Sequence, residues 1–121
     1  LSIQRKLRGG ATHRDVALAM SALAGLDGDA GNWAASEREH REALVVWERA
    51  MGAKHVETAT ARARLAKAVH ARGRPGEAYC LYREAEAALV AAGVKETAPS
   101  LKGLRDQMAA ALKDSLARAG R

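Results

Sequence analysis

The sequence predicts an all-α fold built from antiparallel helical hairpins, and three observations support this prediction. First, 48% of the 121 residues are hydrophobic, yet the chain has only two Trp, two Tyr and no Phe, so its core must consist mainly of Ala, Leu and Val. Alanine has the highest helix propensity of all residues. Second, glycine and proline divide the chain into stretches with helical periodicity. Third, the pattern of residues 13–54 recurs in residues 55–96.

Short breaks that contain glycine or proline set the bounds of the expected helices. Glycine ends helices because it adopts a left-handed conformation without strain. Pro75 and Pro99 stand where helices would begin, the position at which proline is tolerated. Such short connections force consecutive helices to turn back on one another. The expected helices are 16–27, 33–51, 56–72, 75–92 and a fifth that begins near Pro99.

Apolar residues within each expected helix recur at intervals of three and four, the spacing of one helix face. We expect Leu65, Ala66, Tyr82 and Ala85 to be buried together. On the solvated faces, opposite charges four residues apart support the helix, as with Glu37 and Arg41. The expected buried face of the first helix comprises Val16, Ala19, Met20, Leu23 and Leu26.

The two copies of the pattern align without gaps. Leu23-Ala24 falls on Leu65-Ala66, and Arg41-Glu42-Ala43 falls on Arg83-Glu84-Ala85, 42 residues further along. A helical hairpin cannot bury its apolar face alone, so repeated hairpins stack and share a continuous core. We therefore expect a single repeat domain over residues 1–121. Its parts are the tail of a preceding repeat (1–12), two repeats (13–54 and 55–96), and a cap or first helix of a further repeat (97–121).

This arrangement resembles the tetratricopeptide repeat family, in particular the 42-residue repeats of kinesin light chains. Leu1-Ser2-Ile3 and His13-Arg14-Asp15-Val16-Ala17 match the junction between such repeats. The resemblance implies a right-handed α-solenoid whose role is protein–protein interaction. It also has departures. The Asn residues that usually hold a bound peptide are replaced by Ser21-Ala22 and Ala63-Arg64, and His40 replaces the repeat tyrosine.

The same resemblance places the first helix of each hairpin on a concave binding face. Counted from the Leu-Ala pair, the residues expected on this face form a basic stripe. Because Arg makes bidentate contacts to carboxylates, we predict a groove for an acidic peptide. The predicted peptide-binding residues are Thr60, Arg64, Lys67, His70, Lys102 and Arg105.

The sequence predicts no enzymatic activity, no cofactor and no metal site. His13 and His55 recur at the repeat period, which indicates a structural role, and His40 lies on an apolar stripe like a core residue. Cys80 is expected to pack as a small hydrophobic residue. No Cys/His spacing typical of zinc and no phosphate-binding loop is present in the sequence. A single cysteine excludes an internal disulfide and favours an intracellular over a secreted protein.

Two other functions stay open at this point. A net charge of +6 raises nucleic acid as a partner, but the aromatic residues that would stack on bases lie in the apolar stripes. The other alternative is that the repeats form one arm of a larger signalling NTPase or enzyme, because such arrays are often appended to these proteins in the families that the chain resembles. We expect residues 1–8 to leave apolar side chains uncovered, which predicts self-association of the fragment. No apolar run is long enough for a membrane span.

Overall fold

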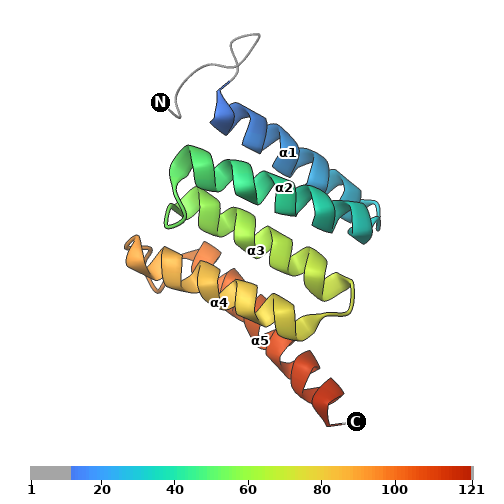
Figure 1. Cartoon of the computed structure of the whole chain (residues 1–121). Helices are drawn as coiled ribbons and strands as arrows, with labels where there is room; N and C mark the ends of the chain where they lie inside the picture. The colour runs from blue at the N-terminus through green and yellow to red at the C-terminus, as the bar shows by residue number, and fades with distance from the viewer. Residues whose placement is uncertain (1–11, 121) are drawn as a thin grey trace.

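The computed structural model describes residues 12–120, which form five helices and no strand. Consecutive helices lie side by side and run in opposite directions, and the end of α5 extends beyond the others (Figure 1). The all-α prediction is confirmed. The expectations for residues 1–8 lie outside the described residues. The helices are α1 (His13–Asp29), α2 (Trp33–Met51), α3 (Val56–Ala71), α4 (Pro75–Ala91) and α5 (Pro99–Ala119).

Local chemistry fixes the helix ends close to where the sequence predicts them. At the start of α1, Thr12 Oγ1 accepts a hydrogen bond from the Asp15 backbone N–H at 3.1 Å. The Asp15 carboxylate accepts one in return from the Thr12 N–H, also at 3.1 Å, which completes a capping box. Gly31 and Gly73, at the same place in the two turns, both have φ of 85°, where a side chain would be strained.

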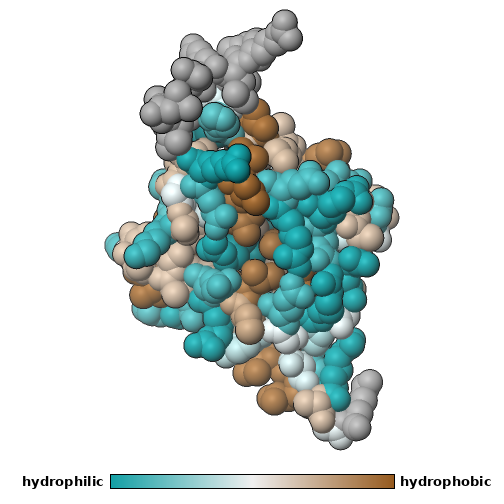
Figure 2. All heavy atoms as spheres, viewed as in Figure 1, coloured by the Kyte–Doolittle hydropathy of each residue, from teal (hydrophilic) through white to brown (hydrophobic). Residues whose placement is uncertain are grey.

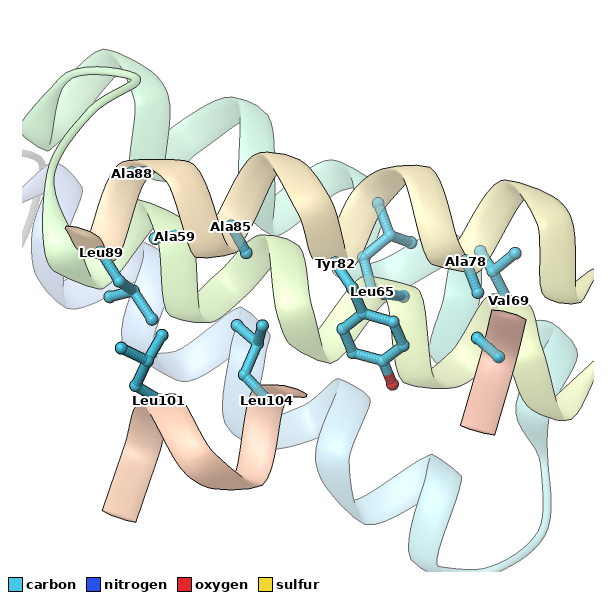
Figure 3. Close-up of a cluster of buried hydrophobic side chains, with 12 residues drawn as sticks. Ala59, Leu65, Val69, Ala78, Tyr82, Ala85, Ala88, Leu89, Leu101 and Leu104 are labelled. Carbon is cyan, nitrogen blue, oxygen red and sulfur yellow. The ribbon is translucent and has the colours of Figure 1, made fainter. Parts of the chain in front are cut away.

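The helices pack mainly on their neighbours in the chain, as expected for stacked hairpins. The larger core cluster joins α3, α4 and α5, and in Figure 3 Leu89 of α4 points toward Leu101 and Leu104 of α5. Leu65 and Tyr82 are each 1% exposed, and burial raises the pKa of Tyr82 to about 12. Leu65, Ala66, Tyr82 and Ala85 are buried together, as predicted.

The prediction for the buried face of α1 is wrong. Leu23 is 51% exposed and Leu26 is 66% exposed. Two physical reasons account for this. First, the small residues of α1 let α2 approach it closely. Second, α1 is the first described helix, so no described helix covers its other side, whereas α3 is covered by α2. The buried residues of α1 are instead Ala17, Ser21, Ala24 and Gly28.

Cys80 also differs from the expectation, because it is exposed. The buried side of α4 passes through Ala78 and Tyr82. Cys80 lies two residues beyond Ala78, about 200° around the helix, and therefore faces away from the core. His40, by contrast, is buried, with 5% of its surface exposed, as expected from its apolar stripe.

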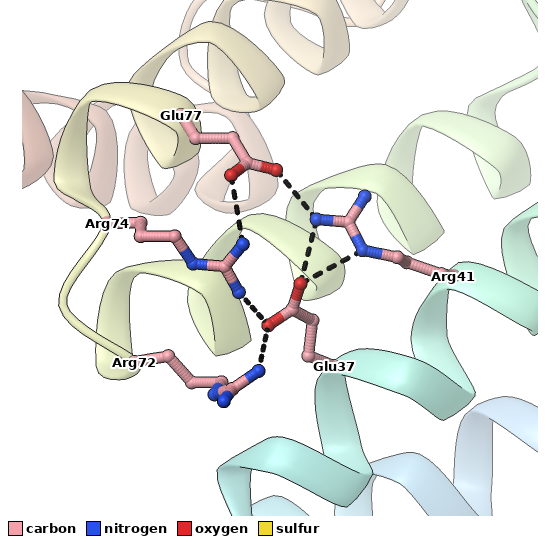
Figure 4. Close-up of polar contacts among 5 residues, drawn as sticks. All are labelled: Glu37, Arg41, Arg72, Arg74 and Glu77. Carbon is pink, nitrogen blue, oxygen red and sulfur yellow. Dashed lines mark hydrogen bonds and ion pairs between the residues drawn. The ribbon is translucent and has the colours of Figure 1, made fainter.

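A charge network ties α2 to the turn between α3 and α4 (Figure 4). Glu37 was expected on a solvated face, but it is only 5% exposed. Its carboxylate accepts hydrogen bonds from Arg41 at 2.8 Å and Arg72 at 2.9 Å, and it pairs with Arg74. Glu77 bridges Arg41 and Arg74 at 2.6 and 3.2 Å. The network therefore joins the first hairpin to the second.

Burial alone would raise the pKa of Glu37. Hydrogen bonds from Arg41 and Arg72, together with the charge of Arg74, outweigh burial and hold the pKa below its usual value. Glu37 is therefore ionised throughout the physiological range.

The face shown in Figure 2 is mostly hydrophilic. Hydrophobic atoms gather in a narrow column across the upper helices and in a second group near the C-terminal end of α5. Leu116 of α5 is 64% exposed. None of the helices formed by residues 12–120 is long and apolar enough to cross a membrane.

Candidate functional site

Two hollows adjoin along α3. The first lies between α1, α2 and α3 and has a volume of about 460 Å³. The second lies between α3 and α5 and has a volume of about 320 Å³. Arg64 and Lys67 line both hollows and therefore stand between them. We call the two hollows together the α3 groove.

Three of the predicted site residues line the α3 groove. Thr60 lines the second hollow, and its hydroxyl donates to the Val56 carbonyl at 3.0 Å, which leaves its oxygen able to accept a hydrogen bond. Arg64 and Lys67 are one turn apart and both are exposed. The structure thus brings Thr60, Arg64 and Lys67 together on one face of α3.

His70 lies at the edge of this surface. It lines a third hollow together with Lys67 and Trp33. Its Nε2 lies 2.6 Å from an Asp114 carboxylate oxygen, so its ring is engaged by α5. Arg118 of the same helix donates to the Gly73 carbonyl at 3.0 Å. The C-terminal half of α5 therefore closes this end of the surface.

Lys102 and Arg105 line none of these hollows, which differs from their predicted placement. Arg105 donates to Glu86 of α4 at 2.6 Å and pairs with Glu96. Hydrogen bonds to Glu96 and Glu86 raise the pKa of Arg105. Burial of Leu101 and Leu104 fixes the rotation of α5, so other residues of this helix line the second hollow. They are Pro99, Ser100, Gly103, Leu104 and Gln107.

Arg64 and Lys67 form no ion pair within the part of the chain that the structure describes. Their neighbour Arg62 is paired with Glu48 at 2.9 Å. Asp29 is the one acidic residue among those that line the two hollows of the groove. The α3 groove therefore carries excess positive charge, which attracts anionic groups.

The family model of the tetratricopeptide repeat matches residues 15–89, which span most of α1 to α4. This chain belongs to the tetratricopeptide repeat family. Proteins of this family generally mediate protein–protein interactions, and their repeats are generally non-catalytic scaffolds. No curated protein and no solved structure matched the chain.

In this tetratricopeptide repeat chain, the floor of the first hollow consists of three polar residues that sequence reasoning did not place in the binding site. Ser21 Oγ accepts a hydrogen bond from Trp47 Nε1 at 3.0 Å. Ser36 Oγ donates to the Ala24 carbonyl at 2.8 Å. His40 lies beside them and lines the hollow. The signal that could have identified them is three polar residues at buried helical positions.

His40 is neutral at physiological pH. Burial lowers its pKa, and the positive charge of Arg64 lowers it further. Positive charge in the first hollow therefore comes from Arg64 and Lys67 alone. No cluster of three or more potential metal ligands occurs among residues 12–120.

Proposed function

We propose that this tetratricopeptide repeat chain is an interaction scaffold that binds an acidic peptide segment of a partner protein in the α3 groove. The observation that carries the proposal is the pair Arg64 and Lys67. Both are exposed, both line the two hollows, and neither has an ion-pair partner among the described residues. Most of the Arg–Glu pairs among the described residues join one helix to another. Arg64 and Lys67 take part in none of these pairs, so their side chains remain available to a ligand.

The geometry supports an extended peptide rather than a single ion. The two hollows lie on opposite sides of Arg64 and Lys67, so a chain crossing α3 would fill both and pass between the two cations. Arginine binds carboxylates bidentately, and lysine adds a point charge. Ser100 and Gln107 of α5 offer polar groups at the second hollow for the peptide backbone.

The proposal includes the kinesin-light-chain-like type of repeat, which is supported by the 42-residue spacing between Gly31 and Gly73 and by their equal φ angles. In this proposal the chain contributes binding and no catalysis. Lys102 and Arg105, which lie outside the groove, have no part in the contact.

The test is a titration of the wild type and of the double variant Arg64→Glu with Lys67→Glu. The ligands are an acidic peptide and a mixed-sequence oligonucleotide, each at low and high salt. The matched control is Arg38→Glu with Lys113→Glu, which makes the same change of charge at exposed residues that line none of the three hollows described above.

We expect the wild type to bind the peptide and to lose affinity as salt rises, because exposed charges are screened over about 8–10 Å. The groove variant should lose peptide binding, and the control should retain it. Equal loss in both variants, or tighter binding of the oligonucleotide, would indicate that diffuse positive charge attracts nucleic acid and would contradict the proposal.

A further inference from the structure

His40 is a buried titratable side chain that the proposed peptide contact does not use. It lies on α2 with 5% of its surface exposed, and its Nδ1 is buried without a hydrogen-bond partner among the described residues. A neutral imidazole carries a proton on one ring nitrogen, whereas the protonated ring has a donor on both nitrogens and a positive charge. Protonation would therefore place a charge and an unpaired N–H donor in the interior of the first repeat. Both cost free energy unless a partner compensates for them.

The charged residues around His40 do not supply such a partner. Those that line the first hollow with it are Arg64 and Lys67 of α3 and Asp29 of α1. Glu37, one turn before His40 on α2, is already paired with three arginines. Burial lowers the pKa of His40 and the charge of Arg64 lowers it further, and no carboxylate among the described residues offsets them. A protonated His40 would therefore be repelled by α3.

The second repeat has no such group at the equivalent position. Tyr82 stands 42 residues after His40 and is 1% exposed in the larger core. Burial raises the pKa of Tyr82 to about 12, so its hydroxyl stays neutral. Ser36, one turn before His40, likewise corresponds to Ala78 in the second repeat. The first repeat therefore has an interior group that can gain a charge near neutral pH, and the second repeat has an uncharged ring in its place.

We propose that His40 is a pH-sensitive switch that controls whether the first hollow of the α3 groove is formed. While the imidazole is neutral, α1, α2 and α3 pack together and bound the hollow. When the imidazole gains a proton, repulsion from Arg64 and the unpaired N–H separate α2 from α3. The groove is thus intact at neutral pH and loosens in mild acid. The switch is built into the fold, so it goes beyond the proposed peptide function and does not depend on it.

The lowered pKa of His40 fixes the sign of the effect. The unfolded chain binds this proton more readily than the folded chain, so stability falls as the pH drops through the ordinary histidine value of about 6.5. Carboxylates with lowered pKa values, such as Glu37, lose their contribution at lower pH, near about 4.3. Glu39 acts in the opposite direction, but equally in the wild type and in every variant that retains it.

The experiment is a series of thermal melts between about pH 8 and about pH 5.5, the range in which histidine changes its charge. Toward acid, the melting temperature of the wild type should fall relative to those of His40→Tyr and His40→Gln. Neither replacement gains a charge in this range. His40→Tyr introduces the side chain that the second repeat carries at this position, and His40→Gln keeps a polar group. Both variants retain the other three histidines, which therefore cannot cause the difference.

Arg64→Gln and Lys67→Gln provide a matched pair. Both residues are exposed and line the same hollow one turn apart, but of the two only Arg64 lowers the pKa of His40. Arg64→Gln should reduce the loss in acid, and Lys67→Gln should behave like the wild type. The indole N–H of Trp47 donates to Ser21 at 3.0 Å and reports the packing of α2 on α1. Its NMR signal should shift in mild acid in the wild type and stay fixed in His40→Tyr.

Three results would overturn the switch. The first is an equal change of melting temperature with pH in the wild type, His40→Tyr and His40→Gln. The second is an equal effect of Arg64→Gln and Lys67→Gln, because the repulsion would then not come from Arg64. The third is a Trp47 signal that acid leaves unchanged while the stability of the wild type falls, because the loosening would then lie outside the first hollow. Each of these results would leave the peptide proposal standing, since none of the measurements uses a peptide.

Discussion

Replacing Glu37 by Gln should destabilise the chain more than any other single charge removal among the described residues. The side chain of Glu37 is 7% exposed, and its carboxylate pairs with Arg41, Arg72 and Arg74. Removing one partner of a fully buried pair costs roughly 3–5 kcal/mol. Here the side chains of the three arginines are 42–44% exposed, so water can solvate them in the variant. We therefore expect a loss of about 2 kcal/mol.

The assay is urea unfolding of the wild type, Glu37→Gln and Glu77→Gln at neutral pH. Glu77 contacts two of the same arginines, but its side chain is 41% exposed, so its loss should cost less than about 1 kcal/mol. The pKa of Glu37 is lowered in the folded state, so its contribution is present above its unfolded pKa and is lost as the pH falls. Equal stability of the wild type and Glu37→Gln would refute this reasoning.

Three further predictions concern stability. Leu65→Ala should cost roughly 2–5 kcal/mol, because Leu65 is 1% exposed within the larger core; a thermal melt unchanged from the wild type would contradict this. Glu39→Gln should raise the melting temperature at neutral pH. The nearby carboxylate of Asp27 and burial raise the pKa of Glu39, so the folded state binds this proton more tightly and loses stability as the pH rises through that pKa. The melting temperatures of wild type and variant should converge in acid. Gly73→Ala should destabilise the chain by about 1 kcal/mol because φ is 85° there, whereas Gly103→Ala in the second turn of α5 should stabilise it; denaturant midpoints that shift in the same direction would be the contrary result.

The helix bounds could be predicted from the sequence because glycine and proline act locally. Pro75 and Pro99 begin α4 and α5, and Gly31 and Gly73 end the turns that precede α2 and α4. The contact between Glu37 and Arg41 was also predictable, since the two residues lie one helical turn apart. Each of these features depends on residues that are close together in the chain.

The features that could not be predicted depend on how helices are rotated against each other. A count of apolar residues placed Leu23 in the core, but the small residues Ala17 and Ala24 face α2 instead. In α5, burial of Leu101 turned Arg105 toward Glu86 and away from the groove. Glu37 contacts Arg72 and Arg74, which lie 35 and 37 positions further along the chain. These contacts, like the floor around His40, depend on tertiary packing alone.

The central claim is that an acidic peptide lies in the α3 groove. Chemical-shift mapping of the wild-type chain during titration with such a peptide tests it most directly. The account predicts that the largest shifts fall on Thr60, Arg64 and Lys67, with smaller ones at Ser100 and Gln107 across the second hollow. Largest shifts at Arg38 or Arg83, on the exposed sides of α2 and α4, would contradict it.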